Sequence, residues 1–140
     1  MEISLVRPLP NAVGSVSQRF GETLADYAAF GMLGHNGVDY EAPAGTPVRA
    51  AHAGACRVGY DANGYGNFVR VVTGDYQTIY AHLEAVQVDE DQTVEAGAQL
   101  GRVGSSGSSS GPHLHFGLKI QNGANPGYFN WIDPLPFRDL

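Results

Sequence analysis

Lysine and cysteine are almost absent from this chain of 140 residues, and each scarcity excludes a class of function. Lys119 is the only lysine, the arginines are scattered and the net charge is −6, so no basic face for nucleic acid or anionic membranes is expected. Cys56 is the only cysteine, which excludes an internal disulfide. It stands in a predicted strand, so we interpret it as a small buried hydrophobe and not as a nucleophile.

Long apolar runs are absent too. No stretch approaches the roughly 18 apolar residues of a membrane span, and the N-terminus has no basic start followed by an apolar run, so no signal peptide is expected. The length suits one domain with its own core, and we expect residues 1–140 to form a single domain, either on its own or cut from a longer chain. Such a chain is either a mature domain or reaches its target by another route.

Glycine, by contrast, is abundant, with 19 residues in 140, about twice the usual share of roughly 7%. This favours a β-rich fold with many tight turns over a helical bundle. Apolar alternation and turn residues predict short strands at 13–20, 47–60, 67–73, 76–83, 93–103 and 113–120. Residues 22–30 are the best helix candidate. Residues 104–111, rich in serine and glycine, are expected to form a loop at the rim of a site, and the tail at 123–140, which holds Trp131, is expected to wrap over the barrel.

Four of the five histidines fall in three short strings, which are HNGVD at 35–39, YAHL at 80–83 and GPHLHF at 111–116. Neutral imidazole is the commonest protein ligand for zinc, and a catalytic zinc site uses three protein ligands and an open position. The strings therefore offer enough ligands for one such site and leave two histidines for proton transfer. The fifth, His52, is interpreted as a structural histidine.

The last string begins a strand in which Leu114 and Phe116 alternate with His113 and His115. The apolar set is expected to face the core, so both histidines face the other way. Two residues along a strand span roughly 6.5–7 Å. This separation suits one metal ligand and one catalytic group beside the metal better than two ligands of one ion.

The first string offers His35 and Asp39 on a loop that enters a strand. A carboxylate with two imidazoles is a known type of open zinc site. In the second string, strict alternation places His82 on one face with Thr78 and Tyr80, from which it is expected to reach the same open surface. The chain has no His-Glu-x-x-His helix, so the glutamate base of common metalloproteases is missing. A histidine with a free pKa of roughly 6.5 is suited to move the proton instead.

Together, these motifs resemble the lysostaphin-type zinc metallopeptidases, which cut peptide cross-links in bacterial peptidoglycan. The resemblance covers about residues 16–134. Beside the three histidine strings it includes QRFG at 18–21, PAGTPV at 43–48, GYGN at 64–67, VEAG at 94–97 and the segment 104–116. Residues 20–34 are similar to phage-associated members of the family.

The resemblance implies a zinc ion held by His35, Asp39 and His115, with His82 and His113 as the catalytic histidines. It implies a small, mainly β, antiparallel fold, the duplicated hybrid motif or barrel-sandwich hybrid, with the site in a groove flanked by loops. Relatives that only activate other hydrolases have lost ligands, whereas all five residue types are present here.

Some relatives also supply a tyrosine near the metal. Tyr27 is the candidate in this chain, although a packing role is favoured for it.

The function expected from the resemblance is that of a monomeric, zinc-dependent endopeptidase acting on peptidoglycan stem peptides and cross-bridges outside the cytoplasm, in the periplasm, in the medium or from a phage virion. One of His82 and His113 would accept a proton from water and pass it to the leaving amine, and the other would stabilise the oxyanion. The sequence assigns neither role, nor the cross-link that is cleaved.

Two other classes of function also fit parts of the sequence. A peptidoglycan-binding or hydrolase-activating module would use zinc only structurally, and the intact ligand set argues against it. A lipoyl- or biotinyl-type carrier needs a lysine on an exposed hairpin, whereas Lys119 lies in the histidine strand.

Overall fold

The computed structural model describes residues 3–10, 13–22, 35–107, 109, 111–120 and 130–137. Within these residues the chain forms ten strands and one short 3₁₀ helix. They are β1 (Ser15–Gln18), β2 (Val38–Glu41), β3 (Pro47–Arg49), β4 (Gly54–Asp61), β5 (Gly66–Val72), β6 (Tyr76–Val86), β7 (Thr93–Val94), β8 (Gln99–Val103), β9 (His113–Ile120), β10 (Trp131–Ile132) and η3 (Leu135–Phe137). No helix in these residues is long and apolar enough to cross a membrane.

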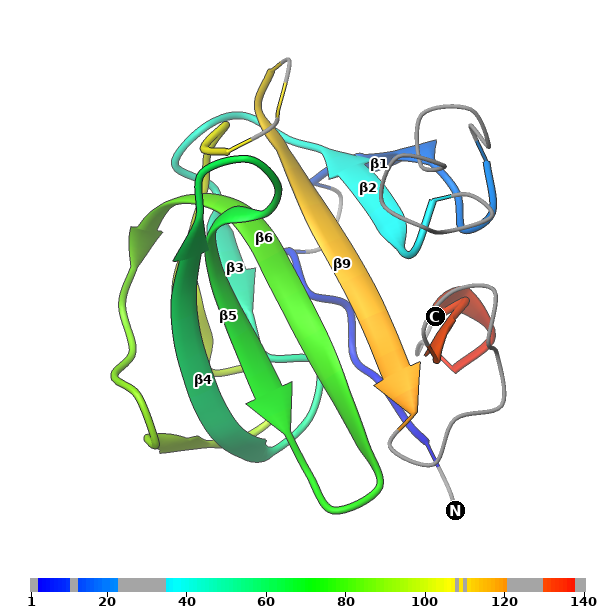
Figure 1. Ribbon diagram of the computed structural model, residues 1–140, viewed down its shortest axis with the longest axis vertical. Coiled ribbons are helices and arrows are strands. Elements are labelled where there is room, and N and C mark those ends of the chain that lie inside the picture. The colour runs from blue at the N-terminus through cyan, green and yellow to red at the C-terminus, as the bar shows by residue number, and fades with distance from the viewer. Residues whose placement is uncertain are drawn as a thin grey trace.

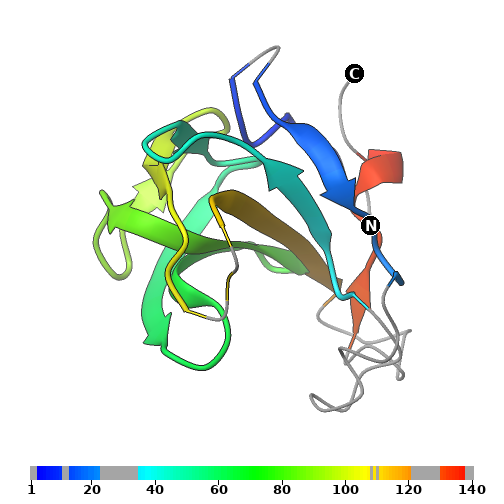
Figure 2. The same cartoon turned by 90° about the horizontal axis from the view of Figure 1, so that it is seen from above.

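All ten strands belong to one antiparallel sheet, whose main path runs β1-β2-β9-β6-β5-β4-β7 (Figure 1). Three strands lie off this main path. Of these, β10 pairs with β9, and β8 pairs with both β3 and β6. The strands curl strongly, as the view from above shows (Figure 2), but those described do not close into a barrel. The prediction of a mainly β, antiparallel fold is confirmed.

The strand predictions from turn residues are confirmed as well. The turn at Gly74 joins β5 to β6, and Gly97, with φ of 88°, separates β7 from β8. The expected helix at 22–30 falls almost wholly on residues 23–34, which lie outside the described part of the chain. Tyr27 lies outside it too.

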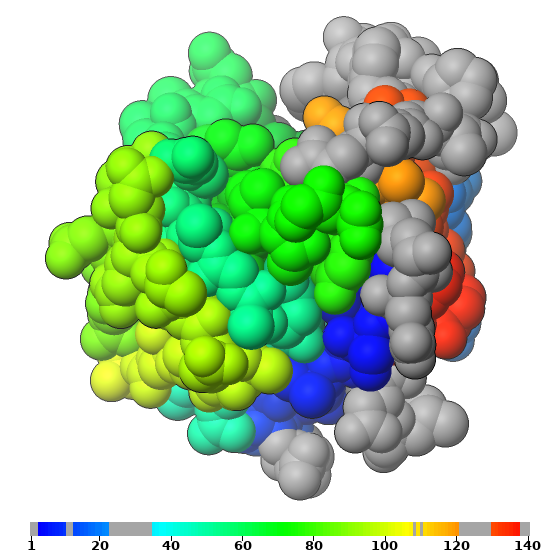
Figure 3. Space-filling model, turned by 90° about the horizontal axis from the view of Figure 1, so that it is seen from below, coloured from blue at the N-terminus to red at the C-terminus, as the bar shows by residue number. Residues whose placement is uncertain are grey.

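The core lies between the curled strands and is built from their inward-facing apolar side chains. Tyr80 of β6 and Phe116 of β9 are fully buried, with ring centroids 5.4 Å apart. The N-terminal segment adds Leu5, whose N–H donates to the carbonyl of Phe137. Figure 3 shows this blue segment at the surface, beside the green atoms of the sheet. Trp131 belongs to β10, which pairs with β9, and its side chain is buried. The wrapping tail is therefore confirmed for residues 130–137.

A chain of polar groups crosses this core. The N–H of Ala51 donates to the Tyr80 hydroxyl at 2.8 Å, that hydroxyl lies 2.7 Å from Oγ1 of Thr78, and Oγ1 lies 2.8 Å from Nε2 of His52. Because Nδ1 of His52 donates to the carbonyl of Ala53 at 2.8 Å, Nε2 accepts from Thr78. The interpretation of His52 as a structural residue is thus supported, and Cys56, fully buried in the core cluster, is the small hydrophobe expected.

Candidate active site

The site is built on the pairing of β2 with β9, in the middle of the sheet. Val38 and Phe116 are Cα partners and both are buried in the core. The next pair in this register is Asp39 with His115, and because strand side chains alternate, both point to the opposite face of the sheet. The sequence alternation in β2 and β9 therefore places a carboxylate directly across from an imidazole.

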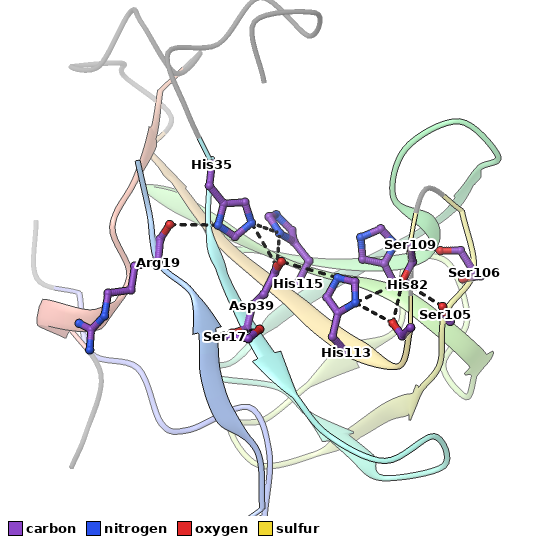
Figure 4. A network of polar contacts seen from close by, with 11 residues as sticks. Ser17, Arg19, His35, Asp39, His82, Ser105, Ser106, Ser109, His113 and His115 are labelled. Carbon is purple, nitrogen blue, oxygen red and sulfur yellow. Dashed lines mark hydrogen bonds and ion pairs between the residues drawn. The ribbon is translucent and has the colours of Figure 1, made fainter. Parts of the chain in front are cut away.

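Three potential metal-ligating atoms meet at this point (Figure 4). Nε2 of His35 lies 3.1 Å from Oδ1 of Asp39 and 3.1 Å from Nδ1 of His115, and the last two atoms are 3.0 Å apart. A tetrahedral zinc ion with bonds of roughly 2.0–2.1 Å has ligand atoms about 3.3 Å apart. The triangle thus has nearly the dimensions of one face of a zinc tetrahedron. In the described ranges it is the one group of three or more such residues whose ligand atoms come this close.

The backbone orients the first of these ligands. Nδ1 of His35 donates to the carbonyl of Arg19, just beyond β1, at 3.1 Å. With the proton on Nδ1, the lone pair of Nε2 points to the triangle, which is the usual arrangement of a metal-ligating histidine. The ring of His115 is held from one side by His35, with centroids 4.9 Å apart, and from another by Tyr65, at 5.6 Å.

Burial and charge act in opposite directions on these groups. Burial alone would raise the pKa of Asp39, but the hydrogen bonds and charges of His115 and His35 outweigh it and hold that pKa well below its usual range. Burial lowers the pKa of His115, although Asp39 opposes this effect. The carboxylate of Asp39 is therefore ionised, which is the protonation state that metal binding requires of it.

His82 reaches the same face by an irregularity that alternation did not predict. Tyr80 and Leu83 both lie in the core cluster although they are three residues apart, and the register of β5 against β6 shifts between their partners, Val69 and Asn67. This is a bulge with one extra residue on β6. His82 sits in it with φ of 64°, a left-handed conformation that is uncommon outside glycine.

The expectation that His82 shares an open face with Thr78 and Tyr80 is therefore wrong. Both of those side chains are fully buried, and only the bulge turns His82 away from them. His82 instead follows Ala81, which is the Cα partner of His115 on β9.

Two carbonyls hold His82 in place. Its backbone N–H donates to the carbonyl of Tyr65 at 2.7 Å, and its Nδ1 donates to the carbonyl of Ser106 at 2.8 Å. Burial lowers the pKa of His82 to about 4, and the neighbouring His113 and His115 act in the same direction against the Ser106 carbonyl. The ring is consequently neutral near pH 7, with its lone pair on Nε2.

His113 has a parallel arrangement. Its Nδ1 donates to the carbonyl of Gly111 at 2.9 Å, with the Ser109 hydroxyl 3.2 Å away, and its Nε2 lies 3.7 Å from Oδ2 of Asp39. Its ring centroid is 4.6 Å from that of His82. The His113 side chain is 19% exposed, against 13% for Asp39, 5% for His115 and 0% for His35, so it lies nearest to solvent in this series.

The structure thus brings together all five residues singled out from the sequence. Sequence reasoning missed the groups that orient them, namely the carbonyl of Arg19, the side chains of Asn36 and Tyr65, and Ser106. Asn36 is buried and donates through Nδ2 to the Tyr65 hydroxyl at 2.7 Å. All four lie in segments that carried the family resemblance, namely QRFG, HNGVD, GYGN and 104–116, but nothing in the sequence connects any of them to a particular histidine.

Comparisons with known proteins find similar sequences and structures. Residues 33–126 match the family model described as Peptidase family M23. Over 87 residues the chain is 45% identical to the DD-carboxypeptidase/endopeptidase Mpg of Neisseria meningitidis, a match that covers 61% of this chain and 20% of that protein. The chain thus spans about a fifth of the length of this curated relative.

Solved structures give the same result. The catalytic domain of lysostaphin from Staphylococcus simulans superposes with a TM-score of 0.68 and 34% identity, covering 75% of this chain and 79% of that one. A zinc-containing peptidase from Vibrio cholerae superposes with a TM-score of 0.75 and 28% identity, covering 86% of this chain and 38% of that one.

Proposed function

The chain belongs to Peptidase family M23, and from that premise we propose that it is a zinc-dependent endopeptidase that hydrolyses the peptide cross-links of bacterial peptidoglycan. One observation carries the proposal. Three ligand atoms converge at 3.0–3.1 Å on one face of the sheet, and two further histidines stand beside them with Nδ1 of each bonded to a carbonyl. Peptidoglycan lies outside the cytoplasm, so we propose that the protein acts there, whether exported or delivered by a phage.

The residues present fit a zinc ion. His35, Asp39 and His115 form a two-imidazole, one-carboxylate set, the type found in open zinc sites. Their close approach would be unfavourable for three lone-pair-bearing atoms without a shared cation or proton. When bound, zinc polarises a peptide carbonyl and makes water more acidic, which is the chemistry that hydrolysis of an amide requires.

The two remaining histidines handle the proton. Because Nδ1 of His82 and of His113 is committed to a carbonyl, each ring presents Nε2 toward the ligand set. A neutral ring accepts a proton from water at Nε2 and then passes it to the leaving amine. We assign this role to His82, since its lowered pKa keeps it neutral, and assign stabilisation of the oxyanion to the less buried His113, which would do so in the form that carries a proton on Nε2 as well as on Nδ1.

The test is digestion of purified peptidoglycans of several cross-link types with the zinc-loaded protein, followed by mass spectrometry of the fragments. Loss of cross-linked fragments, with a new amino end on one half of the former cross-link and a new carboxyl end on the other, would establish an endopeptidase and identify the bond, whether glycyl-glycine, D-alanyl-diaminopimelate or another. The His113→Ala protein serves as the matched control. If zinc is bound but no wall type yields new ends, the proposal fails, and retention of the protein on the wall would then indicate a binding module.

A further inference from the structure

We propose that Ser106 is a positioning residue for His82, in which the hydroxyl fixes the 104–107 segment to two strands and the carbonyl then sets the orientation of the His82 ring. The inference rests on the proposed function, because it gives His82 a task that depends on orientation. It concerns a residue that touches neither the ligand set nor His113.

The hydroxyl of Ser106 connects two strands at the bulge. It accepts from the N–H of Asn67 in β5 at 3.0 Å and donates to the carbonyl of Leu83 in β6 at 2.7 Å. Asn67 and Leu83 are Cα partners in the ladder, next to the register shift. The hydroxyl thus stands between a backbone donor and a backbone acceptor whose ladder pairing the bulge disturbs, and it satisfies both.

The segment is also pressed against the β4–β5 turn. Gly66 and Gly107 have φ of 62° and 74°, and a Cβ on Gly66 would collide with the backbone of Ser106. A Cβ on Gly107 would collide in turn with the backbone of Gly66. Contacts this close leave Ser106 little room to shift, so its carbonyl occupies one position relative to β6.

That carbonyl accepts the proton of Nδ1 of His82 at 2.8 Å. The bond from the backbone N–H of His82 to Tyr65 holds the left-handed main chain but leaves the ring free to rotate about its side-chain torsions. The Ser106 carbonyl is therefore the contact that selects both the rotamer and the tautomer, and the tautomer decides whether Nε2 carries a lone pair.

The experiment compares zinc-loaded wild type with Ser106→Ala and Ser106→Thr, and uses Ser15→Ala, an exposed serine of β1, as the matched control. Zinc per chain, kcat and KM on a cross-linked peptide, and the ring ¹⁵N shifts of His82 are measured on each protein. We expect Ser106→Ala to keep its zinc and a KM within about twofold of wild type, while kcat falls roughly ten- to a hundredfold. Its His82 spectrum changes from one tautomer to a mixture. Ser106→Thr keeps the hydroxyl, so it restores kcat and the single tautomer.

Three outcomes would overturn the inference. The first is a single, unchanged His82 tautomer in Ser106→Ala, and the second is a Ser106→Thr protein that restores neither readout. The third is a fall in kcat that only follows loss of folded protein or of zinc, with folding monitored by circular dichroism. If wild type shows no hydrolysis at all, the proposed function fails, yet the NMR comparison still tests the role of Ser106 by itself.

Discussion

His52, in the bend between β3 and β4, and His82, in β6, are two buried histidines with different roles. They are 4% and 7% exposed, and each donates its Nδ1 proton to a backbone carbonyl at 2.8 Å. Burial lowers the pKa of both. By the measures usually used to recognise a functional histidine, which are burial, a shifted pKa and a fixed tautomer, the two are equivalent.

They differ in what the second nitrogen meets. Nε2 of His52 accepts the proton of Thr78, whose hydroxyl in turn accepts from Tyr80, so that the polar chain is complete. No described residue hydrogen-bonds to Nε2 of His82, whose ring faces that of His113. A saturated imidazole stabilises the fold, whereas an anchored imidazole with one open lone pair is prepared to accept a proton.

The largest effect is expected from removing a ligand. His115→Ala deletes one corner of the triangle, so the protein should lose stoichiometric zinc, and turnover should fall by roughly 10⁴-fold or more. Zinc is measured by mass spectrometry of the metal after dialysis, and turnover on cross-linked peptides. His52→Gln, which alters a histidine outside the triangle, should keep its zinc. A His115→Ala protein with full zinc would show that the ligand set is wrongly assigned.

The next effect separates the two open imidazoles from the ligands. His82→Ala and His113→Ala should each retain zinc, since neither residue belongs to the triangle, while kcat falls by about 10²–10⁴-fold. Zinc content and kcat measured on one preparation distinguish this from the loss of a ligand. Wild-type turnover in either variant would remove that histidine from the mechanism.

The polar chain through Tyr80, Thr78 and His52 predicts the opposite result, a loss of stability without a loss of activity. Thr78→Val keeps the shape of the side chain but leaves Nε2 of His52 and the Tyr80 hydroxyl without their common partner, which should lower the free energy of unfolding by about 1–3 kcal/mol. The value of kcat/KM should stay within about twofold of wild type. Urea unfolding gives the first quantity and peptide hydrolysis the second. A loss of activity without loss of stability would mean that the network belongs to the site.

The smallest effect is a dependence of stability on pH. Since the folded pKa of His52 lies below 6.5, the unfolded chain binds more protons at acid pH, so the free energy of unfolding falls as the pH drops below about 6.5 and is flat above it. His82 and His115 act with the same sign in metal-free protein.

Comparing wild type with His52→Gln isolates the contribution of His52. The free energies of unfolding of the metal-free proteins are measured by urea titration between pH 7.5 and pH 5. The free energy should fall less steeply in the variant than in wild type, by up to about 1.4 kcal/mol per pH unit. Equal slopes would contradict a neutral, buried His52.

What the sequence predicted well has a simple physical origin. The strand with Leu114 and Phe116 and the segment with Asp39 follow strict alternation, and alternation fixes the face of each side chain. His82 broke the same rule because a bulge is decided by contacts between distant segments. The Asn67–Ser106–Leu83 bridge spans three separate stretches of chain, and no local pattern records it.

The left-handed backbone of His82 also has an evolutionary consequence. A non-glycine residue held at such φ costs about 1–3 kcal/mol relative to a relaxed one. Glycine at this position would relax the main chain and delete the ring in one step. Screening a library for heat tolerance alone would therefore enrich inert chains, while selection for lysis would keep the population away from its most stable sequence. At position 82, thermal stability and the proposed hydrolytic activity therefore favour different residues.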